Sequence, residues 1–170
     1  MKIFLIGYMG SGKTYWGKLL SQKLGLPFFD LDSKIEEQAG CSIARIFEER
    51  SEEYFRLMEK DVLYLLSENH ESFVMACGGG TPCFYNNIDY LRSKGTTVWL
   101  NCSVDTLYKR LIKEKDHRPM ISAIPDEELW AFITKKYAGR KIFYQQASVI
   151  LSEEGLHLDQ LVTSIFHANN

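Results

Sequence analysis

The sequence predicts an α/β fold with a five-stranded parallel sheet and helices on both faces. Short apolar runs of strand length alternate with helical patterns along the chain, which is typical of such a sheet. A glycine-rich turn directly follows the first run, as expected where a strand passes into a helix. The 170 residues contain no Pro-, Gly- or Ser-rich linker, so we expect a single domain over residues 1–170.

Five segments have the length and the apolar character of buried strands. They lie near Lys2–Ile6, Phe28–Asp30, Phe73–Cys77, Thr96–Asn101 and Ser148–Leu151. The first helix is predicted to begin at about Lys13 and to stop at Gly25, and Trp16 on its apolar stripe is expected in the core. Because ligands of such sheets bind beyond the carboxyl ends of the strands, the residues after each strand are the site candidates.

The turn after the first strand fits the phosphate-binding pattern G-x-x-x-x-G-K-[ST] at every fixed position of residues 7–14. Its glycines allow backbone N–H groups to point at phosphates, Lys13 adds a positive charge, and the Thr14 hydroxyl suits Mg²⁺. A nucleoside triphosphate site is indicated, with candidates Gly10, Ser11, Gly12, Lys13, Thr14 and Tyr15. Tyr8 and Tyr15 are expected to be exposed, and packing is a more common role for a tyrosine than ligand contact.

Acidic residues and glycines follow the next two strands. Asp30 and Asp32 are alternate residues of an extended segment, so both carboxylates can project to one side. One could serve Mg²⁺ and the other a substrate hydroxyl, but Asp32 or Ser33 could equally cap the following helix. Residues 78–80 are three consecutive glycines, which either admit a ligand close to the backbone or form a simple turn.

Three arginines complete the candidate site. Arg56 lies on a long predicted helix, where an exposed i,i+3 pair with Glu59 is the simpler interpretation. Arg118 lies in a charged stretch that interrupts the helical pattern and has the character of a mobile lid over about residues 112–125. An arginine on a lid can reach a γ-phosphate when the lid closes. For Arg140, an exposed helix charge is the alternative.

Composition favours small-molecule partners. The formal net charge of −2, without a dense basic cluster, argues against nucleic acid. The apolar N-terminal run is too short to cross a membrane. Because this run passes straight into the glycine-rich turn, we expect neither a signal peptide nor an anchor, and hence a cytoplasmic location. The 4 cysteines and 4 histidines are scattered, which argues against zinc and for reduced thiols.

Taken together, these elements resemble the shikimate kinases, which belong to the nucleoside monophosphate kinase-like group of P-loop proteins. The resemblance covers nearly the whole chain and rests on the phosphate-binding loop, Asp30-x-Asp32, Phe55-Arg56-x-x-Glu59, Gly78-Gly79-Gly80, Arg118-Pro119 and Arg140-x-x-x-Tyr144. It implies an enzyme that transfers the γ-phosphoryl group of ATP to the 3-hydroxyl of shikimate, on the route to aromatic amino acids. We expect Mg²⁺ as cofactor and a monomer without nucleic-acid or membrane partners.

The resemblance also implies roles for single residues. Lys13, Asp32 and Arg118 would act in catalysis, with Asp32 accepting the proton of the attacking hydroxyl. Arg56 and Arg140 would hold the shikimate carboxylate, and the substrate would also contact Asp32, Gly78, Gly79 and Gly80.

At the nucleotide, the resemblance implies that Thr14 binds Mg²⁺ directly and Asp30 binds it through water. Arg110 and Arg118 would contact ATP. The loop near Ser152–Gly155, which packs against adenine in the family, shows no distinctive side chain.

Two other functions remain open. Another small-metabolite kinase of this fold, gluconate- or nucleotide-kinase-like, would explain the loop and the lid but not Asp32, Arg56, the glycine triplet and Arg140 together. A non-catalytic nucleotide-binding module would have no need of Lys13, Thr14 and the three arginines. A GTPase is not favoured, because the chain has no N-K-x-D motif.

Overall fold

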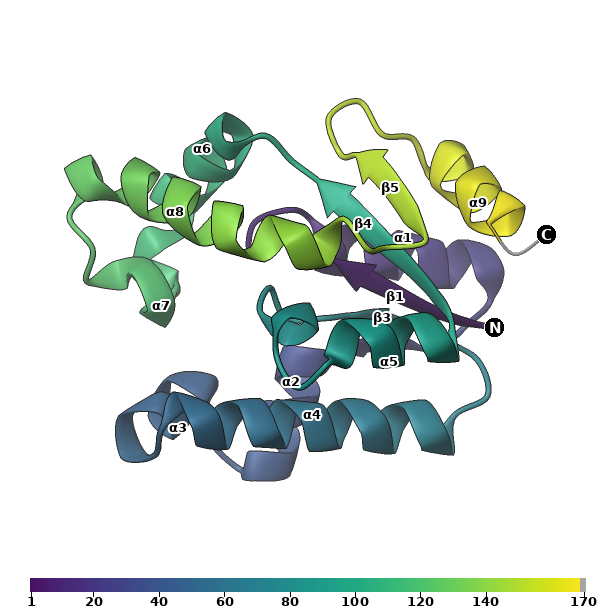
Figure 1. Ribbon diagram of the computed structural model, residues 1–170, viewed down its shortest axis with the longest axis horizontal. Helices are drawn as coiled ribbons and strands as arrows, with labels where there is room; N and C mark the ends of the chain where they lie inside the picture. The colour runs from purple at the N-terminus through teal and green to yellow at the C-terminus, as the bar shows by residue number, and fades with distance from the viewer. Residues whose placement is uncertain (169–170) are drawn as a thin grey trace.

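The computed structural model describes residues 1–168 and contains the predicted five-stranded parallel sheet (Figure 1). The strands are β1 (Lys2–Ile6), β2 (Phe28–Asp30), β3 (Phe73–Ala76), β4 (Thr96–Asn101) and β5 (Val149–Ser152), in the spatial order β2-β3-β1-β4-β5. The helices are α1 (Lys13–Leu24), α2 (Leu31–Ala39), α3 (Ile43–Glu49), α4 (Glu52–Asn69), α5 (Asn87–Lys94), α6 (Val104–Glu114), α7 (Pro119–Ser122), α8 (Asp126–Tyr144) and α9 (Leu158–His167), with short 3₁₀ turns η1 (Thr81–Cys83) and η2 (Lys115–His117). The predicted strands are thus confirmed.

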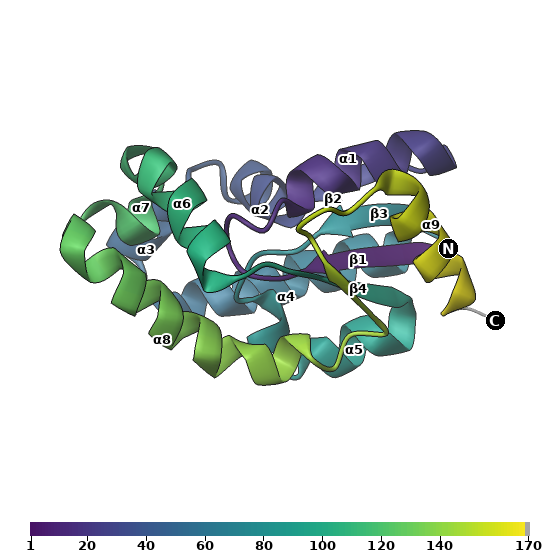
Figure 2. The same ribbon diagram turned by 90° about the horizontal axis from the view of Figure 1, so that it is seen from above.

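The central strand, β1, separates two hydrophobic cores. It pairs in parallel with β3 on one side and with β4 on the other. Ile3 and Leu5 point into a core shared with α1 and α9, whereas Phe4 and Ile6 point into a larger core against α4, α5, α6 and α8. Figure 2 shows α1 and α9 on one side of β1 and α5 on the other. A strand buried on both faces needs apolar residues in succession, as β1 has.

The parallel arrangement brings the loops that follow the strands to one edge of the sheet. The helices α3 and α7 both stand at that end of the molecule (Figures 1 and 2). In the segment expected to be a lid, α6 continues to Glu114, and η2 and α7 supply short helical turns. Among residues 1–168, no helix is both long and apolar enough to cross a membrane.

Helix α1, which carries the end of the phosphate-binding loop, approaches the sheet closely through Gly17. A Cβ at this position would lie 2.5 Å from Cε2 of Phe28 and 3.3 Å from Cδ1 of Leu5. Phe28 and Leu5 belong to β2 and β1. The absence of a side chain at Gly17 therefore sets the distance between α1 and these two strands.

Gly17→Ala is expected to destabilise the protein by about 1–3 kcal/mol, because the added methyl group forces α1 away from the sheet. Gly139→Ala in α8 is the matched control, since no described atom lies within 4 Å of the Cβ that it would add. Alanine favours helix over glycine, so the control should keep or raise stability by up to about 1 kcal/mol. Urea denaturation measures both, and equal midpoints for Gly17→Ala and wild type would contradict this account of the packing.

Candidate active site

The turn between β1 and α1 has the backbone of an anion-binding loop. Gly7, Gly10 and Gly12 have positive φ angles of 141°, 81° and 86°, a region that side chains strongly disfavour. Lys13 folds back over the turn and donates to the carbonyl oxygens of Gly7 and Tyr8, each at 2.8 Å. Burial lowers the pKa of Lys13 to about 8, with an opposing contribution from Asp32. The lysine thus places its amino group inside the loop, where an anion would bind.

Two oxygen-bearing side chains meet beside this loop. The Thr14 hydroxyl donates to Oδ2 of Asp30 at 2.7 Å. Asp30 also caps α2, because its Oδ1 accepts from the backbone N–H of Ser33 at 3.4 Å. Capping by Asp32 or Ser33 was therefore the wrong alternative, since α2 already begins at Leu31. A hydroxyl beside a carboxylate fits Mg²⁺, which prefers oxygen ligands and often shares them with phosphates.

A cavity of about 630 Å³ adjoins the loop and brings together the predicted substrate residues. These are Asp32, Arg56, Gly78, Gly79, Gly80 and Arg140, and Arg118, predicted for catalysis and ATP contact, lines the same cavity. Met9 of the phosphate-binding loop also lines the cavity, as do Phe47 of α3 and Met120 of α7. The cavity therefore lies between the loop, α3 and the segment that carries Arg118.

A buried ion pair lies in the wall of this cavity. Nη1 of Arg56 donates to Oε2 of Glu59 at 2.7 Å, and the two residues are only 5% and 0% exposed. Oε1 of Glu59 accepts from the hydroxyl of Thr81 at 2.6 Å. The guanidinium also lies over Phe84, with Cζ 4.3 Å from the ring centroid. The simpler interpretation of an exposed helix pair was wrong, because this face of α4 packs against the chain that follows β3.

The glycine triplet is needed because charged side chains approach its backbone. A Cβ at Gly80 would lie 2.5 Å from Nη2 of Arg56. A Cβ at Gly78 would lie 2.9 Å from Oε1 of Glu59 and 3.0 Å from Oδ1 of Asp32. None of the three glycines has a positive φ, so close approach, and not backbone conformation, excludes a side chain here.

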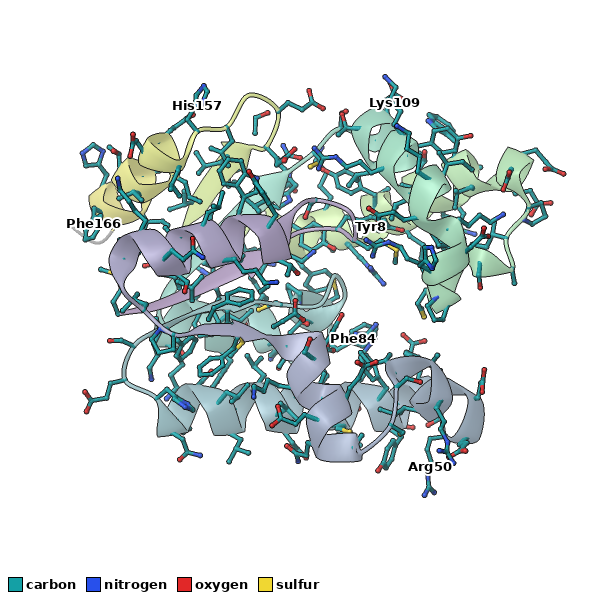
Figure 3. All side chains as sticks on the ribbon, turned by 180° about the vertical axis from the view of Figure 1, so that it is seen from behind. Tyr8, Arg50, Phe84, Lys109, His157 and Phe166 are labelled. Atoms are coloured by element: carbon teal, nitrogen blue, oxygen red, sulfur yellow. The ribbon has the colours of Figure 1, made fainter. Side chains whose placement is uncertain are left out.

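Arg140 reaches the other side of the triplet. Its guanidinium lies over Tyr8, with Cζ 5.4 Å from the ring centroid, and its Nη1 is 3.3 Å from the position a Cβ of Gly79 would take. Tyr8 is only 1% exposed, so the expectation that it would be exposed was wrong, whereas Tyr15 is 62% exposed as expected. Figure 3 labels Tyr8 and Phe84, the aromatic partners of the two guanidinium groups.

Arg118 and Arg110 have different surroundings near the phosphate-binding loop. Arg118 lines the cavity and is paired with Glu114, whose Oε2 accepts from its Nε at 2.9 Å. Arg110 lies outside the cavity and donates from Nη1 to the carbonyl oxygen of Gly10 at 3.0 Å. Its Nη2 donates to Oε2 of Glu153 at 2.8 Å. Glu153, in the loop that showed no distinctive side chain in the sequence, is therefore the partner of Arg110.

The carboxyl group of Asp32 has an altered proton affinity. Loss of water around the carboxylate, together with repulsion from the negative charges of Glu59 and Asp30, raises the pKa of Asp32 to about 6. Lys13 and Arg56 oppose this rise. A carboxylate with this pKa is ionised at neutral pH yet can accept a proton more readily than an ordinary aspartate.

Several residues of the site were not identified from the sequence. Ile43 and Phe47 line the cavity from α3, but their i,i+4 spacing is that of ordinary core residues. Tyr144 was named only as part of the motif Arg140-x-x-x-Tyr144, without a role, and its hydroxyl donates to the carbonyl oxygen of Gly79. Glu114 and Glu153, which pair with Arg118 and Arg110, belong to charged stretches without a distinctive pattern. Only the fold brings these partners together.

A phosphate-binding loop that opens onto a cavity suited to a small anion places this domain in the class of P-loop kinases. The model of the shikimate kinase family matches residues 9–169. A shikimate kinase of Bacteroides thetaiotaomicron is 42% identical over 156 residues, which are 92% of this chain and 89% of the relative.

Solved structures agree with this assignment. The crystal structure of shikimate kinase from Bacteroides thetaiotaomicron has a TM-score of 0.85 at 38% identity and covers 98% of this chain and 95% of its own. The structure from Acinetobacter baumannii, in complex with shikimate, has a TM-score of 0.81 at 29% identity and covers 99% and 94%. The chain belongs to the shikimate kinase family.

Asp32→Asn is expected to make the ligand-free protein more stable at pH 7.5. The folded state raises the pKa of Asp32 from 3.8 to about 6, so it binds this proton more tightly than the unfolded state. The protonated Asp32 carboxyl adds its full contribution to the stability of the folded protein below pH 3.8, and this contribution is lost as the pH rises through about 6. Asparagine carries no charge at any of these pH values, so the variant does not suffer this loss. Because Asp32 is open to solvent in the cavity, we expect a gain on the order of only 1 kcal/mol.

Urea denaturation of wild type and Asp32→Asn at pH 7.5 and pH 4.5 measures this effect. The advantage of the variant should shrink at the lower pH, where Asp32 is protonated in the folded protein. A wild type more stable than the variant at pH 7.5 would contradict the proposed electrostatics of the cavity.

Proposed function

We propose that this protein transfers the γ-phosphoryl group of ATP to the 3-hydroxyl of shikimate, giving shikimate 3-phosphate and ADP. The observation that carries the proposal is the state of Arg56. Its Nη1 donates to Glu59 and its Nε is paired with Glu52 at 3.5 Å, whereas no hydrogen bond engages its Nη2 within residues 1–168. A guanidinium with an unused donor in a cavity suits a second carboxylate.

Shikimate is a ring with one carboxylate and several hydroxyl groups, and the cavity has side chains that can bind each of these groups. Arg56 and Arg140 approach the glycine triplet from two sides and supply forked donors for the carboxylate. Asp32 supplies an acceptor for the hydroxyl groups, and its attraction to Lys13 places it on the side of the phosphate-binding loop. This arrangement would hold the 3-hydroxyl toward the γ-phosphate.

The nucleotide would bind with its phosphates on the backbone of residues 10–12, at the start of α1. Lys13 would exchange the carbonyl oxygens of Gly7 and Tyr8 for phosphate oxygens. Enzymes of this family use ATP with Mg²⁺, and we propose that Thr14 and Asp30 hold the ion. Bound Mg²⁺ would neutralise charge that develops on the phosphates.

Asp32 would accept the proton of the attacking hydroxyl. Its pKa of about 6 leaves it mostly ionised at neutral pH while it keeps an appreciable proton affinity. Because phosphoryl transfer depends mainly on positioning and charge, the larger contribution should come from the fixed orientation of the hydroxyl.

Arg118 would complete the site when residues 112–125 close over it as a lid. It already lines the cavity, where Glu114 holds its guanidinium. Exchange of Glu114 for the γ-phosphate would bring a positive charge to the transferring group and exclude water.

We further propose that the enzyme acts as a cytoplasmic monomer without nucleic-acid or membrane partners. All the residues assigned to the cavity come from one chain. The net charge of −2 gives no general attraction for nucleic acid.

The proposal predicts different defects for Arg140→Ala and Arg118→Ala. Arg140→Ala should raise the KM for shikimate by about tenfold or more and leave the KM for ATP nearly unchanged, because it removes a charged contact to the carboxylate. Arg118→Ala should lower kcat by about a hundredfold or more with little change in shikimate affinity. ADP release with and without shikimate measures both variants.

Arg140→Ala is preferable to Arg56→Ala, because loss of Arg56 would leave Glu59 buried without its cation and destabilise the fold by about 3–5 kcal/mol. Gluconate and nucleoside monophosphates serve as control acceptors. ADP release by the wild type that does not respond to shikimate, or that responds equally to a control acceptor, would contradict the proposed function.

A further inference from the structure

Glu153, in the loop between β5 and α9, joins parts of the fold that are far apart in the sequence. Its Oε2 accepts from Nη2 of Arg110 at 2.8 Å, and its Oε1 accepts from Nε1 of Trp16 at 3.2 Å. Arg110 also donates to the carbonyl oxygen of Gly10 at 3.0 Å. One carboxylate thereby connects α6, α1 and the phosphate-binding loop.

The two members of the ion pair differ in exposure. The side chain of Glu153 is only 10% exposed, whereas that of Arg110 is 38% exposed. Glu153 also packs against the phosphate-binding loop, because its Oε1 is 3.4 Å from the position that a Cβ of Gly12 would take. The carboxylate is therefore enclosed by its partners, while the guanidinium retains a surface that a ligand can reach.

The position of the pair identifies the part of the nucleotide that it would meet. In the acceptor cavity, Asp32 and the glycine triplet follow β2 and β3, on one side of β1. Arg118 and Arg140 reach the cavity from beyond α6, but neither Arg110 nor Glu153 lines it. Arg110 and Glu153 belong to the chain that follows β4 and β5, on the other side. With the γ-phosphate directed at the acceptor, the nucleoside must extend toward Arg110.

We propose that Glu153 is a positioning residue for the nucleoside end of ATP, acting through Arg110. The inference rests on the proposed function, because the acceptor cavity determines the direction of the nucleotide. Glu153 fixes one edge of the Arg110 guanidinium and leaves its exposed surface to contact the base or the ribose. A long, flexible side chain is thereby ordered before the nucleotide arrives, which reduces the entropy lost on binding.

Glu154 provides a matched control from the same loop. Its Oε1 accepts from the hydroxyl groups of Ser103 at 2.7 Å and Thr106 at 2.5 Å. These residues lie at the beginning of α6, and within residues 1–168 no hydrogen bond joins Glu154 to Arg110. Glu154→Gln thus removes the same charge from the loop and leaves the pair between Arg110 and Glu153 intact.

The test compares ADP with inorganic tripolyphosphate, which has phosphates but no nucleoside, by titration calorimetry in the presence of MgCl₂. Glu153→Gln should bind ADP about tenfold more weakly than wild type and bind tripolyphosphate equally well, as expected for a lost charge-assisted contact at the nucleoside end. Glu154→Gln should match wild type with both ligands. Unchanged ADP affinity in Glu153→Gln, or an equal loss for both ligands, would overturn the proposal.

A second variant separates positioning from folding. Arg110→Gln should show the same selective loss of ADP affinity, and adding Glu153→Gln to it should change ADP affinity by less than about twofold. Additive losses in the double variant would contradict action through Arg110. Because these titrations use no shikimate, their outcome is independent of the acceptor, whose identity is tested separately by ADP release from the wild type.

Discussion

The buried ion pair between Arg56 and Glu59 is the interaction on which the rest of the acceptor cavity depends. Removing two charges from water is costly, so such a pair persists only where further hydrogen bonds complete it. Thr81 donates to Glu59, and Phe84 covers the guanidinium. The glycine triplet lets both charged groups lie against the backbone. The wall of the cavity therefore holds a guanidinium group in a fixed position before any substrate binds.

The charged groups in and near this wall also change the pKa values of neighbouring side chains. Glu59 and Asp30 raise the pKa of Asp32, while Asp32 partly counteracts the effect of burial on Lys13. Like charges held close together destabilise the empty site, and ligands with complementary charge relieve that cost. The crowded carboxylates thus lower the stability of the free protein and favour a bound cation such as Mg²⁺, whereas Arg56 and Arg140 would attract the anionic acceptor.

The fold could be predicted from sequence because its signals are local. Apolar runs mark the strands, and the loop before Lys13 has residue types that few other structures need. The burial of Arg56 and Glu59 could not be predicted, since an i,i+3 pair has the same pattern on an exposed helix. Tyr8 was misjudged, and the partner of Glu153 was not foreseen, for a related reason: α8 and α6, which supply the arginine partners, are distant in sequence. The cavity residues were recognised only through their combined resemblance to one family.

Arg56 and Arg140 would select the acceptor by its carboxylate. The most direct measurement compares shikimate with its neutral methyl ester, which keeps the ring and every hydroxyl group, as acceptors in ADP release. The account predicts that kcat/KM for the ester is lower by about a hundredfold or more, because two guanidinium groups lose their anionic partner. Equal kcat/KM values for the acid and the ester would contradict it.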